Sequence, residues 1–212
     1  MPKKIHTFKT VEKAKAVLSN FNKHFEYPQH TDQENSIIVK KSVGGSLFRA
    51  FRGIAEPSKI YRNWANKNFD TIISTFSTIK KMSEYDDYID KLNNSLLNQW
   101  CKQTGTKLGY GPSIKMVNLL IKMIIEEKKY HRQKLIPFLH IPFDQYTLRP
   151  LRNIINDLTD INYKINIPQT ATMKFVNTKE LYVILLKTIR NLSRSSGIDP
   201  IIYEYWSWND KH

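Results

Sequence analysis

Residues 108–129 read LGYGPSIKMVNLLIKMIIEEKK, and this stretch decides the fold. Nearly every residue of 114–125 is apolar, which is typical of a central helix buried on almost all sides. The polar exceptions are Lys115, Asn118 and Lys122, which recur at steps of three and four residues. They therefore form one narrow polar stripe along a buried helix.

A glycine turn precedes this helix. Gly109 and Gly111 permit a tight turn, and Pro112 suits the first position of a helix. Lys115 would then lie in the first helical turn, where burial and the helix dipole both favour a neutral, nucleophilic amine. The alternative is that the lysine extends to solvent at the helix end.

Helical periodicity dominates the rest of the chain, and strand signals occur only at 36–43 and 163–176. The sequence therefore predicts a mainly α fold with at most one short strand pair. In the first half of the chain we expect an amphipathic helix over 11–21 and a basic helix over Ser46–Ala55 that Pro57 ends. A third helix is expected over Ser83–Lys102, opened by a capping box of Ser83 and Asp86 and stopped by Gly105. Near the carboxyl end we expect a helix opened by Asn177 with Glu180 and closed by Gly197, then a short aromatic helix started by Asp199 and Pro200.

The charge balance points to a polyanionic partner. The chain has 33 Lys and Arg against 19 Asp and Glu, a formal charge of +14. This excess favours nucleic acid first and an anionic membrane surface second. A membrane-surface role is the less favoured because the helix with Arg49 and Arg52 is short and no lipidation signal is present. Nor does any apolar run approach the roughly 20 residues that a spanning helix needs. With no apolar signal segment either, we expect a cytoplasmic protein.

The metal-binding residue types are few. A single cysteine, Cys101, excludes an internal disulfide, a cysteine-rich zinc site and an iron–sulfur cluster. The six histidines are scattered without metal-ligand spacing. We therefore expect no metal and no cofactor.

A second informative stretch is HIPFDQYTLR, residues 140–149. Asp144 follows an extended segment that contains Pro142 and precedes an amphipathic one. This is the N-cap position of a helix, so a purely capping aspartate is one explanation of the pattern.

A glycine turn, a lysine on the following buried helix and a Pro-x-Asp entering the next helix resemble the helix-hairpin-helix DNA glycosylases. The similarity extends over Leu108 to Arg149 and is closest to the archaeal 8-oxoguanine DNA glycosylase branch. The resemblance implies an all-helical, two-lobed fold over 1–212, with lobe boundaries near 60–80 and 160–178 and the active site between the lobes. Lys115 would match the lysine that forms a Schiff base, and Asp144 the aspartate that assists it.

The resemblance also implies the partner and the reaction, excision of a damaged or modified base from duplex DNA in base-excision repair. Such an enzyme flips the target base into a pocket. A DNA-binding protein of this kind would associate with the nucleoid. Gly109, Tyr110 and Gly111 would contact a phosphate through their backbone, and Asn118 would face the substrate.

The candidate pocket walls are aromatic, and the candidate backbone contacts are basic. Aromatic residues at helical spacing are otherwise core residues, and exposed charges are otherwise a solvated face. The candidates are Tyr110, Phe143 and Trp100 for the flipped base, and Arg49, Arg52, Lys40 and Lys41 for the nucleic-acid backbone.

Two other functions remain open from the sequence. A non-catalytic nucleic-acid-binding protein would share the charge and the fold but would need neither Lys115 nor Asp144. A small-ligand or protein-interaction module, such as a phage or host-defence factor, would carry the basic surface only incidentally.

Overall fold

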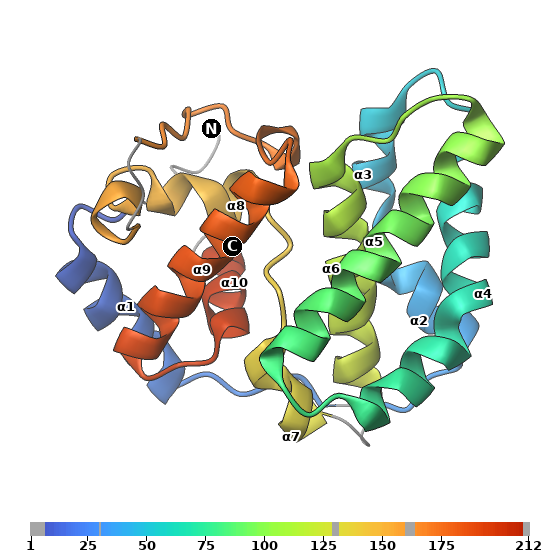
Figure 1. The fold of residues 1–212 in the computed structure, drawn as a ribbon. Helices are drawn as coiled ribbons and strands as arrows, with labels where there is room; N and C mark the ends of the chain where they lie inside the picture. Colours follow the sequence, from blue (N-terminus) through green and yellow to red (C-terminus); the bar gives the residue numbers. More distant parts are fainter. Residues whose placement is uncertain (1–6, 30, 129–131, 160–163, 210–212) are drawn as a thin grey trace. The chain divides into compact units, whose positions relative to one another are not determined.

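The computed structural model describes residues 7–29, 31–128, 132–159 and 164–209. These residues are mainly helical, as expected, and none of them forms a strand (Figure 1). No helix of the described residues is long and apolar enough to cross a membrane.

The chain divides into two compact units. Unit 1 combines residues 1–27 with residues 139–212, and unit 2 is the continuous segment 28–138. The boundaries predicted near 60–80 and 160–178 differ from this division. One long helix occupies most of the first of these regions, and the second belongs to unit 1.

Unit 2 is built around α6, whose neighbours are α2 and α5. Helix α4 packs in turn on α2 and α5. The elements of unit 2 are α2 (Asn35–Ser42), α3 (Gly45–Phe48), the 3-10 turn η1 (Arg49–Phe51), α4 (Pro57–Thr78), α5 (Met82–Thr104), α6 (Tyr110–Glu127), α7 (Arg132–Leu135) and η3 (Ile136–Phe138).

Buried polar contacts join the helices of unit 2. The Trp64 indole N–H on α4 donates to Ser95 Oγ on α5 over 3.1 Å. The hydroxyls of Ser42 on α2 and Tyr61 on α4 are hydrogen-bonded over 2.7 Å. Burial raises the pKa of Tyr61 far above its usual value, so this hydroxyl stays neutral in the core.

The strand predicted at 36–43 is wrong, because this segment forms α2. The β-branched residues Ile37, Ile38 and Val39 favour a strand locally. Ile38, Val39 and Ser42 are nevertheless buried together, which is the spacing of one helical face. Packing on α4 and α6 therefore overrides the local preference.

The basic helix predicted over Ser46–Ala55 is shorter than expected. It consists of α3 and η1, which end at Phe51. Pro57 does not end a helix but is the first residue of α4, where its missing N–H costs no intrahelical hydrogen bond.

The ends of the long helices agree with the sequence better than their beginnings. Gly105 and Gly197 end α5 and α9 with left-handed φ of 66° and 68°, which glycine adopts without strain. The predicted starts are wrong by one or two residues. The Glu84 carboxylate accepts the N–H of Lys80 and Lys81 before α5, and Thr178 caps α9.

Unit 1 joins the first helix of the chain to its last two. Helix α1 packs on α9 and α10, and α10 packs on α8. The residues 164–176 form no strand, and residue 163 of the predicted strand lies outside the described residues. The elements of unit 1 are α1 (Val11–Lys23), α8 (Gln145–Leu148), η4 (Arg149–Leu151), η5 (Ile155–Asp157), η6 (Met173–Phe175), α9 (Lys179–Ser196) and α10 (Pro200–Asn209).

Aromatic contacts hold the two sequence-distant parts of unit 1 together. The Phe8 ring stacks on Trp206 of α10 with centroids 4.6 Å apart. The Phe8 N–H donates to the Pro150 carbonyl over 3.1 Å, and Ser19 Oγ on α1 donates to the Ser196 carbonyl over 2.6 Å. Phe8 is thus part of the unit 1 core.

We expect Phe8→Ala to destabilise unit 1 by about 3–5 kcal/mol, the usual cost of removing a buried phenylalanine ring. Urea unfolding followed by tryptophan fluorescence measures this cost, because Trp206 loses its stacking partner. Ile37→Ala, at an exposed position of α2, should change the stability by less than about 0.5 kcal/mol. Equal effects of the two substitutions would contradict the packing of unit 1.

Candidate active site

Lys115 is the sixth residue of α6 and lies in its second turn, because the helix begins at Tyr110. Its side chain is half-buried. The prediction that Lys115 occupies the first turn is therefore wrong. The helix dipole acts mainly within the first turn, so its electrostatic effect on the Lys115 amine is small.

One side of α6 is accessible, and Lys115 lies on it. The half-buried residues of this side are Lys115, Leu119, Lys122, Met123 and Glu126, which follow one another at helical spacing. The Lys122 ammonium and the Glu126 carboxylate form an ion pair of 3.7 Å. Lys115 and Lys122 thus share one accessible side, as the polar stripe predicted.

Asn118 does not belong to this accessible side. Its side chain is only 2% exposed, among the apolar residues of the helix. Position 118 is one helical turn from Ile114 and Ile121, which are both buried. The prediction that Asn118 faces the substrate is corrected accordingly.

The glycine turn is also placed differently from the prediction. Gly109 is the N-cap of α6 with an extended backbone, and Gly111 lies inside the helix. The left-handed turn is made by Gly105, in the five-residue connection between α5 and α6. These two helices and their connection form a helical hairpin, which we call the α5–α6 hairpin (residues 82–127).

The amino-terminal end of α6 suits an anion. Its first intrahelical hydrogen bond runs from the Ser113 N–H to the Gly109 carbonyl, 3.1 Å away. No side chain caps this end, and the first turn of α6 holds no acidic residue. The N–H groups and the dipole at such an end attract phosphate.

Asp144 is the N-cap of α8, as its sequence context predicted. Its Oδ1 accepts the N–H of Tyr146 over 2.8 Å and that of Thr147 over 3.2 Å. Thr147 Oγ1 accepts the N–H of Asp144 in return, over 2.8 Å. Asp144 is 7% exposed, and this reciprocal cap holds its carboxylate in one orientation.

The surroundings of Asp144 are buried and aromatic. The Tyr203 hydroxyl donates to the Thr147 carbonyl over 2.6 Å. Burial first, and the negative charge of Asp144 second, raise the pKa of Tyr203 well above its usual value. The hydroxyl therefore stays protonated and keeps donating to the α8 backbone.

The segment before Asp144 is buried from Leu139 to Phe143. His140 Nδ1 is hydrogen-bonded to the Tyr182 hydroxyl over 2.6 Å, and Phe143 packs edge-on against the Tyr182 ring. These contacts fix the approach of the chain to α8. They make Phe143 a core residue rather than an accessible pocket wall.

Among the other aromatic candidates, Trp100 is core as well. It is 1% exposed and packs on Phe51, with ring centroids 5.0 Å apart. Tyr110 is half-buried at the first position of α6. An accessible pair of aromatic side chains, Tyr146 and Trp208, lies near Asp144 in the structure, and the helical periodicity of the sequence did not predict this pairing. Trp208 is 36% exposed and packs edge-on against Tyr146, two residues after Asp144.

The two candidate catalytic residues belong to different units, Lys115 to unit 2 and Asp144 to unit 1. Four cationic candidates also lie in unit 2. Their side chains are all exposed and accessible to a partner; they are Lys40, Lys41, Arg49 and Arg52.

Carboxylates are absent from two long segments of unit 2. Residues 35–55 contain four Lys or Arg, and residues 91–125 contain five Lys, without one Asp or Glu in either segment. At the average of 19 acidic residues in 212, the second segment alone would hold about three. The segments also adjoin in the fold, because α2 packs on α6 and Phe51 packs on Trp100.

The described residues hold no group of three or more His, Cys, Asp or Glu that could bind a metal ion. Cys101 is exposed and forms no disulfide with any residue described. No protein-family model matches the chain, and no curated protein or solved structure was found to be similar to it.

We expect Asp144→Ala to destabilise unit 1 by about 1 kcal/mol, because it removes the N-cap of α8. Asp144→Asn should cost only a few tenths of a kcal/mol, since asparagine caps a helix as well as aspartate does. Urea unfolding of the two variants tests the cap. A loss in Asp144→Asn as large as that in Asp144→Ala would mean that the charge of Asp144, rather than its cap, supports the fold.

Proposed function

We propose that this protein is a DNA glycosylase of the helix-hairpin-helix type, which excises a damaged or modified base through a Schiff base formed by Lys115. In this proposal the α5–α6 hairpin is the counterpart of the glycine-containing hairpin of that family. Two compact helical units agree with the two-lobed fold that the resemblance implies.

The observation that carries the proposal is the pair of acid-free segments in unit 2. A surface without carboxylates avoids repelling phosphates, and each lysine or arginine that contacts a phosphate releases a counterion. Lys115 lies within the second segment, on the accessible side of α6. The candidate nucleophile thus belongs to the part of the chain best suited to approach DNA.

The amino-terminal end of α6 supports a phosphate contact near Lys115. The backbone around Gly109 and Gly111 offers N–H groups before the first intrahelical bond. A phosphate held there would position the DNA backbone relative to the lysine one helical turn further on.

In the proposed reaction the Lys115 amine attacks C1′ of a nucleotide whose base has been flipped out of the duplex. The C1′–N bond breaks, and the base leaves with the bonding electrons and takes up a proton. The bound amine loses one proton, and the ring oxygen O4′ takes up a proton as the C1′–O4′ bond breaks, which leaves a protonated imine between C1′ and Lys115. Loss of the proton on C2′ can then expel the 3′ phosphate.

The resemblance assigns the assisting carboxylate to Asp144. In this role its negative charge would stabilise the positive charge that develops on the sugar, and the carboxylate would accept a proton. The cap of α8 supports this function, because the two backbone bonds to Oδ1 hold the carboxylate in place before the substrate arrives.

Borohydride trapping tests the catalytic part of the proposal. We expect a covalent protein–DNA adduct with at least one duplex that carries 8-oxoguanine, another modified base or an abasic site. Lys115→Gln should abolish the adduct, and Asp144→Asn, which keeps the cap, should slow its formation by about 100-fold or more.

The matched control is Lys122→Gln, which removes a lysine from the same accessible side of α6, two turns further along. It should form the adduct at nearly the wild-type rate. If the wild-type protein forms no adduct, the proposed catalysis is contradicted and the alternative function, a non-catalytic nucleic-acid-binding protein, is favoured. An adduct that persists in Lys115→Gln would move the nucleophile to another residue.

DNA affinity tests the nucleic-acid part separately. We expect Arg49→Glu combined with Arg52→Glu to weaken binding to duplex DNA by more than tenfold at about 0.1 M salt, because both residues are exposed in an acid-free segment. Lys179→Glu combined with Lys187→Glu makes the same change in net charge on α9 and should weaken binding less than threefold. Fluorescence anisotropy measures the DNA affinity of both variants. Equal losses of affinity would mean that Arg49 and Arg52 belong to a solvated face and do not contact DNA.

A further inference from the structure

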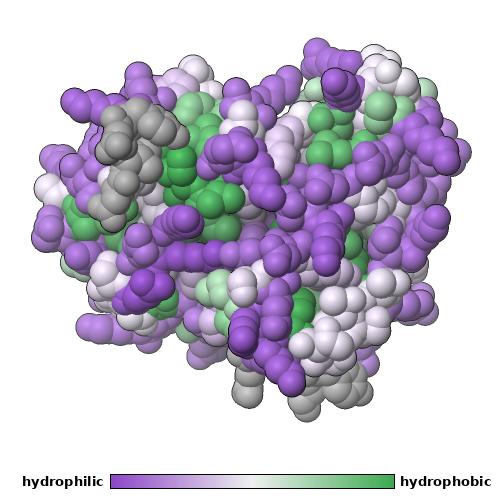
Figure 2. Space-filling model, in the orientation of Figure 1, coloured by the Kyte–Doolittle hydropathy of each residue, from purple (hydrophilic) through white to green (hydrophobic). Residues whose placement is uncertain are grey.

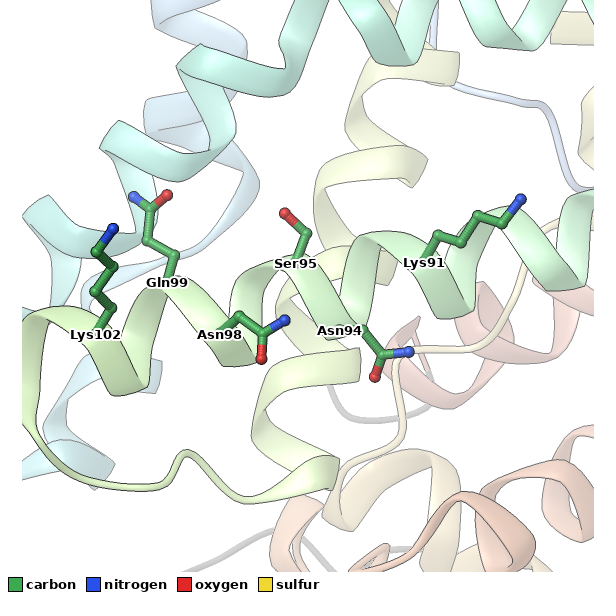
Figure 3. A pocket seen from close by; sticks show the side chains of 6 residues that line it. All are labelled: Lys91, Asn94, Ser95, Asn98, Gln99 and Lys102. Carbon is green, nitrogen blue, oxygen red and sulfur yellow. The ribbon is translucent and has the colours of Figure 1, made fainter.

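One accessible face of α5 carries only lysines and uncharged polar side chains. Six side chains line a shallow groove along this helix (Figure 3). They follow one another at alternating steps of three residues and one, which places them on one face. We call them the α5 strip; they are Lys91, Asn94, Ser95, Asn98, Gln99 and Lys102.

The composition of the α5 strip suits phosphate. It has a lysine at each end and three amides and a hydroxyl between them, all of which are side chains that bind DNA phosphates. The acidic residues of α5 are confined to its first nine residues, and none follows Asp90 before Glu126. Hydrophilic side chains also cover most of the visible surface over the second half of α5 (Figure 2).

The lysines of the α5 strip are available to an outside partner. Lys91 and Lys102 are exposed, and neither makes an ion pair with another described residue. Asn94 and Asn98 are exposed as well. Only Ser95 is engaged by the fold, since its Oγ accepts the Trp64 indole N–H.

The length of the α5 strip fits a nucleic-acid backbone. Lys91 and Lys102 are eleven residues apart, which is about 16 Å along a helix. This corresponds to about five base-pair steps of duplex DNA. The two ammonium groups can therefore contact separate phosphates, with the amides over the phosphates between them.

We infer that the α5 strip is a phosphate-binding track for the duplex DNA backbone, which extends the interface of unit 2 beyond Lys115 and the amino-terminal end of α6. The choice of DNA as the partner rests on the proposed function. The track itself carries no sequence information, because phosphate contacts fix position rather than read bases. It adds length and salt dependence to binding.

The test is the salt dependence of binding to an unmodified duplex, measured by fluorescence anisotropy. Each phosphate contact contributes about 0.9 to the slope of log affinity against log salt. Lys91→Gln combined with Lys102→Gln should therefore lower the magnitude of the slope by nearly 2 and weaken binding at 0.1 M salt by at least tenfold.

Lys174→Gln combined with Lys187→Gln is the control. It removes the same charge from exposed positions of unit 1 and should leave the slope within about 0.3 of the wild-type value. A second variant, Asn94→Asp with Asn98→Asp, keeps both lysines but places carboxylates in the track, and it should weaken binding by more than the control does. Urea unfolding confirms that each variant remains folded.

A slope for the Lys91 and Lys102 variant equal to that of the control overturns the inference, as does a wild-type protein that does not bind duplex DNA. If the true partner were an acidic protein, the slope for duplex DNA would likewise not differ between the two variants. The outcome is separable from the proposed catalysis. A changed slope together with no trapped adduct would support the phosphate-binding track and contradict the glycosylase activity. A trapped adduct together with an unchanged slope would support the glycosylase activity and contradict the track.

Discussion

The burial of α6 is the constraint on which unit 2 depends. Its apolar residues are almost wholly buried, so α2 and α5 must cover them directly and α4 must close the outside. Only one side of the helix is left accessible, and Lys115 and Lys122 lie on that side together with Glu126. Whatever chemistry Lys115 performs, its position follows from this packing.

Unit 1 depends on a different kind of contact, the aromatic and backbone bonds between sequence-distant segments. The Phe8 ring and the α10 aromatics form one core, and the Tyr203 hydroxyl supports α8 by donating to the Thr147 carbonyl. Asp144 is thus held both by its own helix and by the last helix of the chain. A carboxylate anchored in this way loses little further conformational freedom when a substrate approaches.

The sequence predicted the features that short-range chemistry determines. The burial of 114–125, the glycine stops at Gly105 and Gly197 and the cap at Asp144 all follow from a few neighbouring residues. Helix α4 was not predicted, because it begins after Glu56 in a left-handed conformation with φ of 48° and has no side-chain cap. The orientation of Asn118 and the pairing of Tyr146 with Trp208 depend on which helices pack together, and no local pattern contains that information. The chemistry proposed for Lys115 and Asp144 stays a prediction.

The composition of unit 1 from both ends of the chain has a consequence for biosynthesis. Residues 28–138 are complete when the ribosome has yet to make α9 and α10, so unit 2 can fold while α1 still lacks the helices that cover Ala14 and Leu18. During that interval the amphipathic α1 exposes its apolar face to solvent or to a chaperone. Translation speed between α6 and α10 therefore sets how long this nascent segment remains vulnerable to aggregation.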